Sequence, residues 1–251
     1  MKRQQYYLPS QSWLDFLKGS TSVFRKEMAY PNGYSGQTSM NYLSKGSPSY
    51  RFELRKDDPN VNGSKRSEVA LNPEPALDQR TYNYSILLPN GGAEDYALDP
   101  NGSEIITQWH NTPDPGESWT SPPVAIHTGA YHNNLDHYTL ELNWDASPMS
   151  SQKSLQSAHF DLGSFASDKG KWVDWRVHIK WGWLVSQHPL IQIDKNGRRI
   201  FELKHHPNTT NDKQGVYMKF GIYKWDWAQT GAMNASILST RVLYFGNLSI
   251  V

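Results

Sequence analysis

Hydrophobic and polar residues alternate in short runs along most of the chain. Alternation with a period of two is typical of a β-strand with one buried face, because successive side chains point to opposite sides of the backbone. Gly, Pro, Asn and Asp separate the runs and are typical of turns. We therefore predict an all-β fold with strands at residues 50–55, 65–71, 81–88, 104–110, 124–128, 137–144, 171–181, 190–194, 199–204, 216–227 and 241–250.

Several of these runs have one apolar and one polar face. In the run 137–144 the even positions are apolar, whereas in the run 171–181 the apolar residues take the odd positions from 173 onward. We expect two such sheets to pack face to face as a sandwich, and a curved sheet would offer a groove on its outer face that can hold a polymer. The Asp-Lys-Asn-Gly-Arg sequence at 194–198 predicts a hairpin turn, since Asn-Gly readily takes positive φ angles.

The length of 251 residues allows one large core, and no compositional seam divides the chain. We predict a single domain over residues 1–251, in which the segment 1–47 packs on the sandwich and contains one short helix at 10–17. No period repeats along the chain, which argues against propellers and solenoids.

Charge and composition narrow the class of partner. The formal net charge is +1, from 25 basic and 24 acidic residues, so we expect neither nucleic acid nor a membrane surface as a partner. Cysteine is absent, which removes disulfides and thiolate chemistry. Aromatic residues make up 13% of the chain and occur within polar segments, a mixture that suits carbohydrate binding.

The start of the chain carries no signal peptide that we recognise. Met1, Lys2 and Arg3 are followed by polar and aromatic residues rather than by an apolar segment, and no apolar run reaches the roughly 18 residues of a spanning helix. We expect a monomeric protein that is secreted or periplasmic, with its signal peptide not present in this chain.

Three separated stretches carry polar residues on one strand face. They are Lys-Arg-Ser-Glu-Val at 65–69, Gln-Trp-His at 108–110 and Tyr-Met-Lys-Phe-Gly-Ile-Tyr at 217–223. Alternation predicts that Glu104, Ile106, Gln108 and His110 share one face, and that the late strand shows Tyr217, Lys219, Gly221, Tyr223 and Trp225 together. Gly221 would leave room there for a close approach.

These side chains carry the functional groups that β-elimination of a 4-linked uronic acid requires. Arg66 and Gln108 can hydrogen-bond the sugar carboxylate, on which charge develops. His110 can accept the C5 proton, and Tyr223 can protonate the departing O4 or serve as both base and acid if both lie on one side of the ring. Lys219 would favour ionised Tyr223 or hold a neighbouring acidic sugar. The reaction requires no metal or organic cofactor.

The three stretches resemble the strand motifs of the jelly-roll polysaccharide lyases, which read Arg-Ser/Thr-Glu-Leu, Gln-x-His and Tyr-Phe-Lys-x-Gly-x-Tyr in the alginate lyases of that fold. The surroundings at 50–55 and 244–248 are more similar to the heparin lyase I and glucuronan lyase branch. The resemblance spans roughly residue 48 to the C-terminus. It implies a jelly-roll (concanavalin A-like) two-sheet sandwich with a curved groove, and an acidic polysaccharide as substrate.

The resemblance also implies the roles of the site residues. Arg66 and Gln108 would neutralise the carboxylate, with His110 and Tyr223 as base and acid. We further assign Lys219, Tyr217, Arg176, Lys180 and Trp225 to substrate binding. The chain has Val69 and Ala70 where Leu-Arg is usual in alginate lyases, a departure that bears on which uronate polymer is cleaved.

Other interpretations remain open. A glycoside hydrolase on the same fold would need two carboxylates about 5 to 9.5 Å apart, and we find no Glu-x-Asp-x-Glu strand. A non-catalytic carbohydrate-binding module or lectin would bind the polymer without cleaving it, and an adhesion sandwich would have no sugar site. Structural calcium at Asp57 and Asp58 or at 95–99 is disfavoured, because neither stretch matches an ordered ligand loop.

Overall fold

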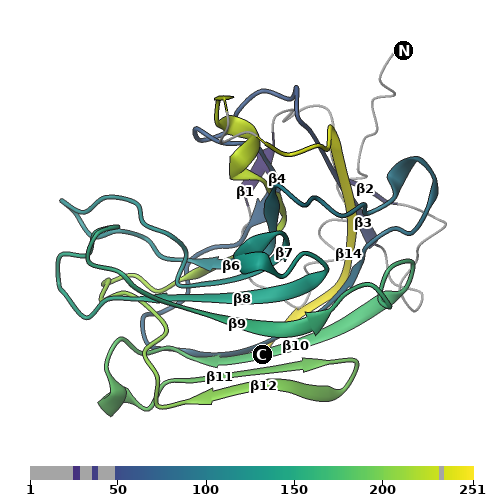
Figure 1. Cartoon of the computed structure of the whole chain (residues 1–251). Coiled ribbons are helices and arrows are strands. Elements are labelled where there is room, and N and C mark those ends of the chain that lie inside the picture. The colour runs from purple at the N-terminus through teal and green to yellow at the C-terminus, as the bar shows by residue number, and fades with distance from the viewer. Residues whose placement is uncertain (1–24, 29–35, 39–48, 232–234) are drawn as a thin grey trace.

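The computed structural model describes residues 25–28, 36–38, 49–231 and 235–251, which form two antiparallel sheets packed as a sandwich (Figure 1). Sheet A contains seven described strands in the order β1 (Arg25–Met28), β4 (Arg66–Ala70), β13 (Tyr217–Tyr223), β6 (Ser103–His110), β7 (Val124–Gly129), β8 (His137–Trp144) and β9 (Gln156–Ser164). Sheet B also contains seven, in the order β12 (Arg198–Lys204), β11 (Leu190–Lys195), β10 (Trp172–Lys180), β5 (Gln79–Leu87), β14 (Thr240–Ile250), β3 (Ser49–Arg55) and β2 (Gly36–Thr38).

Four short 3₁₀ helices are described between the strands. They are η2 (Gly92–Glu94), η3 (Tyr131–Asn133), η4 (Val185–Gln187) and η5 (Trp225–Ala228). No helix in the described ranges is long and apolar enough to cross a membrane.

The predicted alternation explains the core. On β8, Tyr138, Leu140 and Leu142 are fully buried between the sheets, as are Val173 and Val177 on β10. Aromatic rings from both sheets meet there: Phe220 of β13 stacks on Phe245 of β14 with ring centroids 4.2 Å apart. The prediction of an all-β sandwich is confirmed, and the Asn-Gly hairpin between β11 and β12 has the expected positive φ angles, 50° at Asn196 and 78° at Gly197.

The strand boundaries differ from the prediction at two places. The run predicted at 216–227 ends as a strand at Tyr223 and continues into η5. β9 was not predicted, because its sequence is largely polar and its two faces are both partly exposed. The predicted helix at 10–17 lies outside the described residues, whereas β1 and β2 show that the segment 1–47 contributes a strand to each sheet.

A β-bulge in β6 changes which residues share a face. The pairing of β6 with β7 shifts register between Ile105 and Thr107. As a result Ile106 joins the core and Glu104 is fully buried, whereas Ile105 lies on the outer face with Gln108. The prediction that Glu104 and Ile106 share the face of Gln108 and His110 is wrong. The extra residue of the bulge shifts the alternation of faces by one position.

Gly221 allows β4 to approach β13. Its φ is +129°, a conformation that side chains disfavour, and a Cβ there would lie 2.2 Å from the backbone oxygen of Ser67. The close approach expected at Gly221 is therefore made by the neighbouring strand, so the glycine sets the spacing of the strands that carry Arg66 and Tyr223.

We expect Gly221→Ala to lower the free energy of unfolding by more than about 3 kcal/mol, because backbone atoms must move to admit the methyl group. Gly63→Ala is the matched control: its φ is +77°, but no atom lies within 4 Å of the added Cβ, so it should cost only about 1 kcal/mol. Denaturant unfolding of both variants measures the difference. Equal losses would contradict a steric role for Gly221.

Candidate active site

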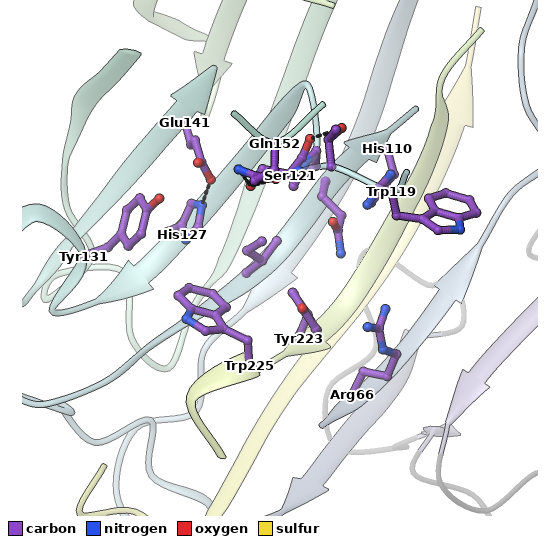
Figure 2. Close-up of a pocket in the computed structure, with 14 residues that line it drawn as sticks. Arg66, His110, Trp119, Ser121, His127, Tyr131, Glu141, Gln152, Tyr223 and Trp225 are labelled. Atoms are coloured by element: carbon purple, nitrogen blue, oxygen red, sulfur yellow. Dashed lines mark hydrogen bonds and ion pairs between the residues drawn. The ribbon is translucent and has the colours of Figure 1, made fainter. Parts of the chain in front are cut away.

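A cleft of about 450 Å³ opens on the outer face of sheet A (Figure 2). It runs across the strands from β4 to β8 and is bordered by the loop after β6 and by η3 and η5. The residues that line it are Arg66, Ile105, Gln108, His110, Trp119, Thr120, Ser121, Pro122, His127, Tyr131, Glu141, Gln152, Tyr223 and Trp225.

The four residues predicted to perform the chemistry all line this cleft. Arg66 comes from β4, Gln108 and His110 from β6, and Tyr223 from β13, which lies between the other two strands. The register places Tyr223 opposite Arg66 on one side and Lys219 opposite Gln108 on the other. Their side chains therefore share one concave surface, although they are far apart in sequence.

A buried carboxylate, Glu68, lies beneath the cleft and contacts three of these strands. Its Oε1 accepts a hydrogen bond of 2.6 Å from Gln108 Nε2, and its Oε2 lies 2.8 Å from Lys219 Nζ. Arg66 reaches the same Oε2 at 3.4 Å. Only 1% of Glu68 is exposed, so these donors offset the cost of burying its charge. The sequence placed Glu68 within a motif but gave it no role.

The same contacts change the expectation for Lys219. Its side chain is as buried as that of Glu68 and does not line the cleft, because its ammonium group is directed at the carboxylate beneath. Lys219 therefore lies beneath the cleft rather than at its surface, and the prediction that it binds substrate is not supported by its position. It supports the site by pairing with Glu68, which in turn orients Gln108.

The imidazole of His110 is oriented by its neighbours. Nδ1 lies 3.0 Å from the backbone oxygen of Asn111, and a carbonyl can only accept, so Nδ1 carries the hydrogen of the neutral ring. The lone pair is then on Nε2. The ring stacks on Tyr217, with centroids 5.8 Å apart, and contacts the edge of Trp119.

This packing also bears on the role of Tyr217. Its side chain is 4% exposed and does not line the cleft, because its ring is covered by His110. Its position beneath His110 indicates that it supports the imidazole, and the predicted contact with substrate stays a prediction.

Arg66 lies over the ring of Tyr223, with its guanidinium carbon 4.4 Å from the ring centroid. A cation over an aromatic face is attracted to it, so the two side chains hold each other in position at the edge of the cleft. Arg66 thereby brings positive charge next to the phenol that is expected to serve as the acid.

Arg176 and Lys180 are not part of this site. Both lie on β10, whose apolar residues point into the core and whose polar residues point away from it on sheet B. Arg176 pairs there with Asp194 at 3.2 Å. Neither residue lines the cleft of sheet A, because β10 joins sheet B, which the sequence could not show, and a role for them in substrate binding stays a prediction.

The comparisons with known proteins fit this geometry. A family model described as polysaccharide lyase matches residues 17–249. The chain belongs to the polysaccharide lyase family. It is accordingly a carbon–oxygen lyase that acts on polysaccharides. No curated protein sequence matches the chain significantly.

Solved structures similar to the lyase share its fold at low sequence identity. An endo-β-1,4-glucuronan lyase from the fungus Trichoderma reesei aligns with a TM-score of 0.68 at 18% identity, covering 91% of this chain and 94% of that one. The alginate lyase A1-II′, a member of polysaccharide lyase family 7, aligns at 0.58 and 14% identity, covering 96% and 97%. The family 7 alginate lyase AlyA1 from Zobellia galactanivorans aligns at 0.51 and 14% identity, covering 94% and 87%. These similarities establish the jelly-roll fold.

Trp225 lines the cleft of the lyase from η5, directly after a lysine that is anchored in the interior. Lys224 Nζ lies 2.9 Å from Asp99, 3.1 Å from Glu104 and 3.2 Å from Asp226. Burial opposes the charge on Lys224, but these three carboxylates raise its pKa above the usual value. The chain between Tyr223 and Trp225 is therefore fixed from below, which positions both rings.

Trp119 is a cleft residue that the sequence did not indicate. It lies in the loop after β6, it is 60% exposed, and its ring packs roughly perpendicular to that of His110, with centroids 5.4 Å apart. The loop is held by Glu117, which accepts a hydrogen bond from the backbone of Asp114, and by Gln152, which accepts one from the backbone of Ser121. A loop residue belongs to no alternating pattern, so the sequence could have suggested a binding role for Trp119 only because it is a tryptophan.

A second group that the sequence did not single out lies at the opposite end of the cleft from Arg66 (Figure 2). His127 Nε2 donates to Glu141 Oε2 at 2.8 Å, and Tyr131 stacks on the His127 ring with centroids 3.8 Å apart. Burial lowers the pKa of His127 despite the adjacent carboxylate. Burial opposes the charge on Glu141, but the hydrogen bond from His127 holds its pKa below the usual range.

The described residues contain no group of three or more His, Cys, Asp or Glu side chains that could hold a metal ion. Two acidic residues of the stretch considered for calcium are in ion pairs instead, Asp95 with Lys169 and Asp99 with Lys224.

We expect Glu68→Gln and Lys219→Met each to lower the free energy of unfolding by about 3 kcal/mol, because each leaves a buried polar group unpaired. The double variant should lose at least about 1 kcal/mol less than the sum of the two. Denaturant unfolding of the four proteins measures this coupling. Strict additivity would show that the pair contributes nothing specific.

Proposed function

We propose that this lyase cleaves a 4-linked uronic-acid-containing polysaccharide by β-elimination and leaves a 4,5-unsaturated uronate at the new end. The observation that carries the proposal is that Arg66, Gln108, His110 and Tyr223 line one cleft. They are a cation, an amide donor, an imidazole and a phenol, which are the groups that this elimination needs and that no metal must supplement.

The carboxylate of the reacting sugar would bind between Arg66 and Gln108. One hydrogen of the Gln108 amide is directed at Glu68, and the second can donate to the ligand. As the C5 proton leaves, negative charge spreads onto this carboxylate, where donors already in place stabilise it. One such donor typically contributes about 2.7 to 4 kcal/mol in comparable anion holes.

The proton transfers follow from the remaining two side chains. Nε2 of His110 takes the C5 proton, the electron pair of that bond forms the C4–C5 double bond, and the C4–O4 bond breaks. The phenol of Tyr223 gives its proton to O4, which leaves as a hydroxyl. When the C5 hydrogen and O4 lie on the same side of the ring, Tyr223 performs both transfers in turn.

The cleft does not suit a glycoside hydrolase. That reaction uses two carboxyl groups that flank the bond to be cleaved. Among the described lining residues the cleft has one, Glu141, since Glu68 is buried under Lys219 and Gln108. A lectin would bind the same polymer but would have no use for an imidazole and a phenol placed on adjacent strands.

The similar structures support a 4-linked uronate as the substrate. One is an endo-β-1,4-glucuronan lyase and two are alginate lyases, and a variant of one of these two, A1-II′, was solved in complex with a substrate. The similarity to heparin lyase I indicated by the sequence stays a prediction.

We expect Tyr223→Phe and His110→Ala to reduce turnover at least about 100-fold while the fold is retained, because each removes a proton-transfer group. The measurement is the ultraviolet absorbance of the unsaturated product. Tyr244→Phe is the matched control, since it makes the same change on sheet B, where the hydroxyl bonds Glu94, and should leave turnover unchanged. Near-normal rates in both site variants would refute the mechanism.

Trp119→Ala should raise KM about fivefold to tenfold with little change in kcat, because the exposed ring can stack on a sugar beside His110 without taking part in proton transfer. Ile237→Ala removes a side chain that is similarly exposed, at 66%, and does not line the cleft, so its KM should not change. A fall in kcat alone would contradict a binding role for Trp119.

A further inference from the structure

The cleft is electrically asymmetric from one end to the other. Among the described lining residues, the cationic side chain is Arg66 on β4, and the anionic one is Glu141 on β8. Three strands, β13, β6 and β7, separate them in the sheet. Figure 2 shows Arg66 and Tyr223 toward one end and Tyr131, His127 and Glu141 toward the other. A chain of sugars lying along the cleft would therefore meet different chemistry at each end.

The Glu141 end presents a carboxylate and aromatic rings. Nε2 of His127 donates to Glu141 Oε2, and Nδ1 of the same ring is buried, so the acceptors that this end offers a ligand are the oxygens of Glu141. Tyr131 stacks on the face of His127, and Trp225 packs roughly perpendicular to both rings at centroid distances of 5.6 and 6.1 Å. Acceptors beside aromatic faces suit the hydroxyls and C–H faces of a sugar.

The same end does not suit a second uronate. A sugar carboxylate there would approach the Glu141 carboxylate, and no cationic lining residue stands beside it to offset the repulsion. His159, whose Nε2 lies 3.8 Å from Glu141, gives little help, because burial and the nearby His132 lower its pKa. A homopolymer of uronates would have to place a charged sugar here.

The separation between His127 and Tyr223 suits a sugar close to the reacting one along the polymer. His127 lies on β7, two strands from Tyr223 on β13. Adjacent strands are about 4.8 Å apart, so the two side chains arise from backbones roughly 10 Å apart. Trp225 lies between them in the cleft (Figure 2).

We propose that the part of the cleft formed by Glu141, His127, Tyr131 and Trp225 is a subsite for an uncharged sugar, so that the substrate is a polysaccharide in which a uronate is joined to neutral sugars rather than a homopolymer of uronates. The inference rests on the proposed function, because it takes the Arg66 end as the place of the reacting uronate. It names which uronate polymer the cleft fits.

Binding to the full-length Tyr223→Phe protein tests the subsite without cleavage. Calorimetric titration compares a 4-linked trisaccharide of three uronates with one in which a central uronate is flanked by neutral hexoses. We expect the mixed trisaccharide to bind at least about tenfold more tightly, since like charges brought together are strongly disfavoured. Adding Glu141→Gln should improve binding of the all-uronate ligand about tenfold and change the mixed one less than about threefold.

Asp161→Asn in the same background is the matched control. It also removes one negative charge from sheet A, but Asp161 of β9 pairs with His137 of β8 and does not line the cleft, so neither affinity should change. The comparison of the two ligands on the Tyr223→Phe protein needs no further variant, and it therefore stands even if Glu141→Gln unfolds the protein. Equal or tighter binding of the all-uronate ligand would overturn the inference.

Cleavage by the unsubstituted lyase separates this inference from the proposed function. Unsaturated product from the uronate homopolymer at a higher kcat/KM than from the mixed polymer would overturn the subsite and leave β-elimination in place. Tight binding of the mixed ligand without unsaturated product from either polymer would overturn the proposed function and support the subsite. Faster product formation from the mixed polymer supports both.

Discussion

The buried carboxylate of Glu68 holds together the three strands from which the candidate site is built. It lies on β4 and is bonded to Lys219 of β13 and Gln108 of β6, so each of the three strands contributes to one charged cluster. A carboxylate removed from water needs such partners, because its burial otherwise costs several kcal/mol. The cluster therefore forms only when the strands are in register.

Register at this point decides the geometry of the cleft. A slip of one residue in β13 would turn Lys219 toward the core and replace it by Met218 or Phe220, which cannot pair with Glu68. The same slip would move Tyr223 away from Arg66, over whose guanidinium its ring lies. Gly221 adds a steric condition, since a side chain there would strike the backbone of β4. Charge and shape thus specify one alignment.

The sequence predicts those parts of this arrangement that depend on residues close together in one strand. Alternation along a strand is a local property, so it correctly assigned Met218 and Phe220 to the core and placed Tyr223 on the outer face. The convergence of Arg66, Gln108, His110 and Tyr223 was predicted from the order and parity of three motifs. The chemical roles of these residues are still predictions.

The predictions differ from the structure where a residue's position depends on other strands. The bulge between Ile105 and Thr107 adds one residue to β6 and reverses the faces expected for Glu104 and Ile105, which alternation cannot reveal. Lys219 has the right parity, but its burial depends on Glu68 from another strand. Arg176 has a polar-face position too, yet its strand joins sheet B. Odd or even position in a strand predicts which face a side chain takes. The sheet that the strand joins, and how deeply the side chain is buried, follow only from the three-dimensional fold.

Glu68 and Glu141 on the outer side of sheet A illustrate how environment gives different roles to identical side chains. Glu68 is buried and paired with Lys219, so its charge is balanced within the protein and positions neighbouring groups. Glu141 lines the cleft beside a histidine whose pKa burial lowers, and in the subsite that we propose its negative charge acts on the ligand. The jelly-roll sheet supplies the same scaffold for both. Selectivity among acidic polymers then depends on where the lining charges are left uncompensated, and that property belongs to side chains rather than to the fold.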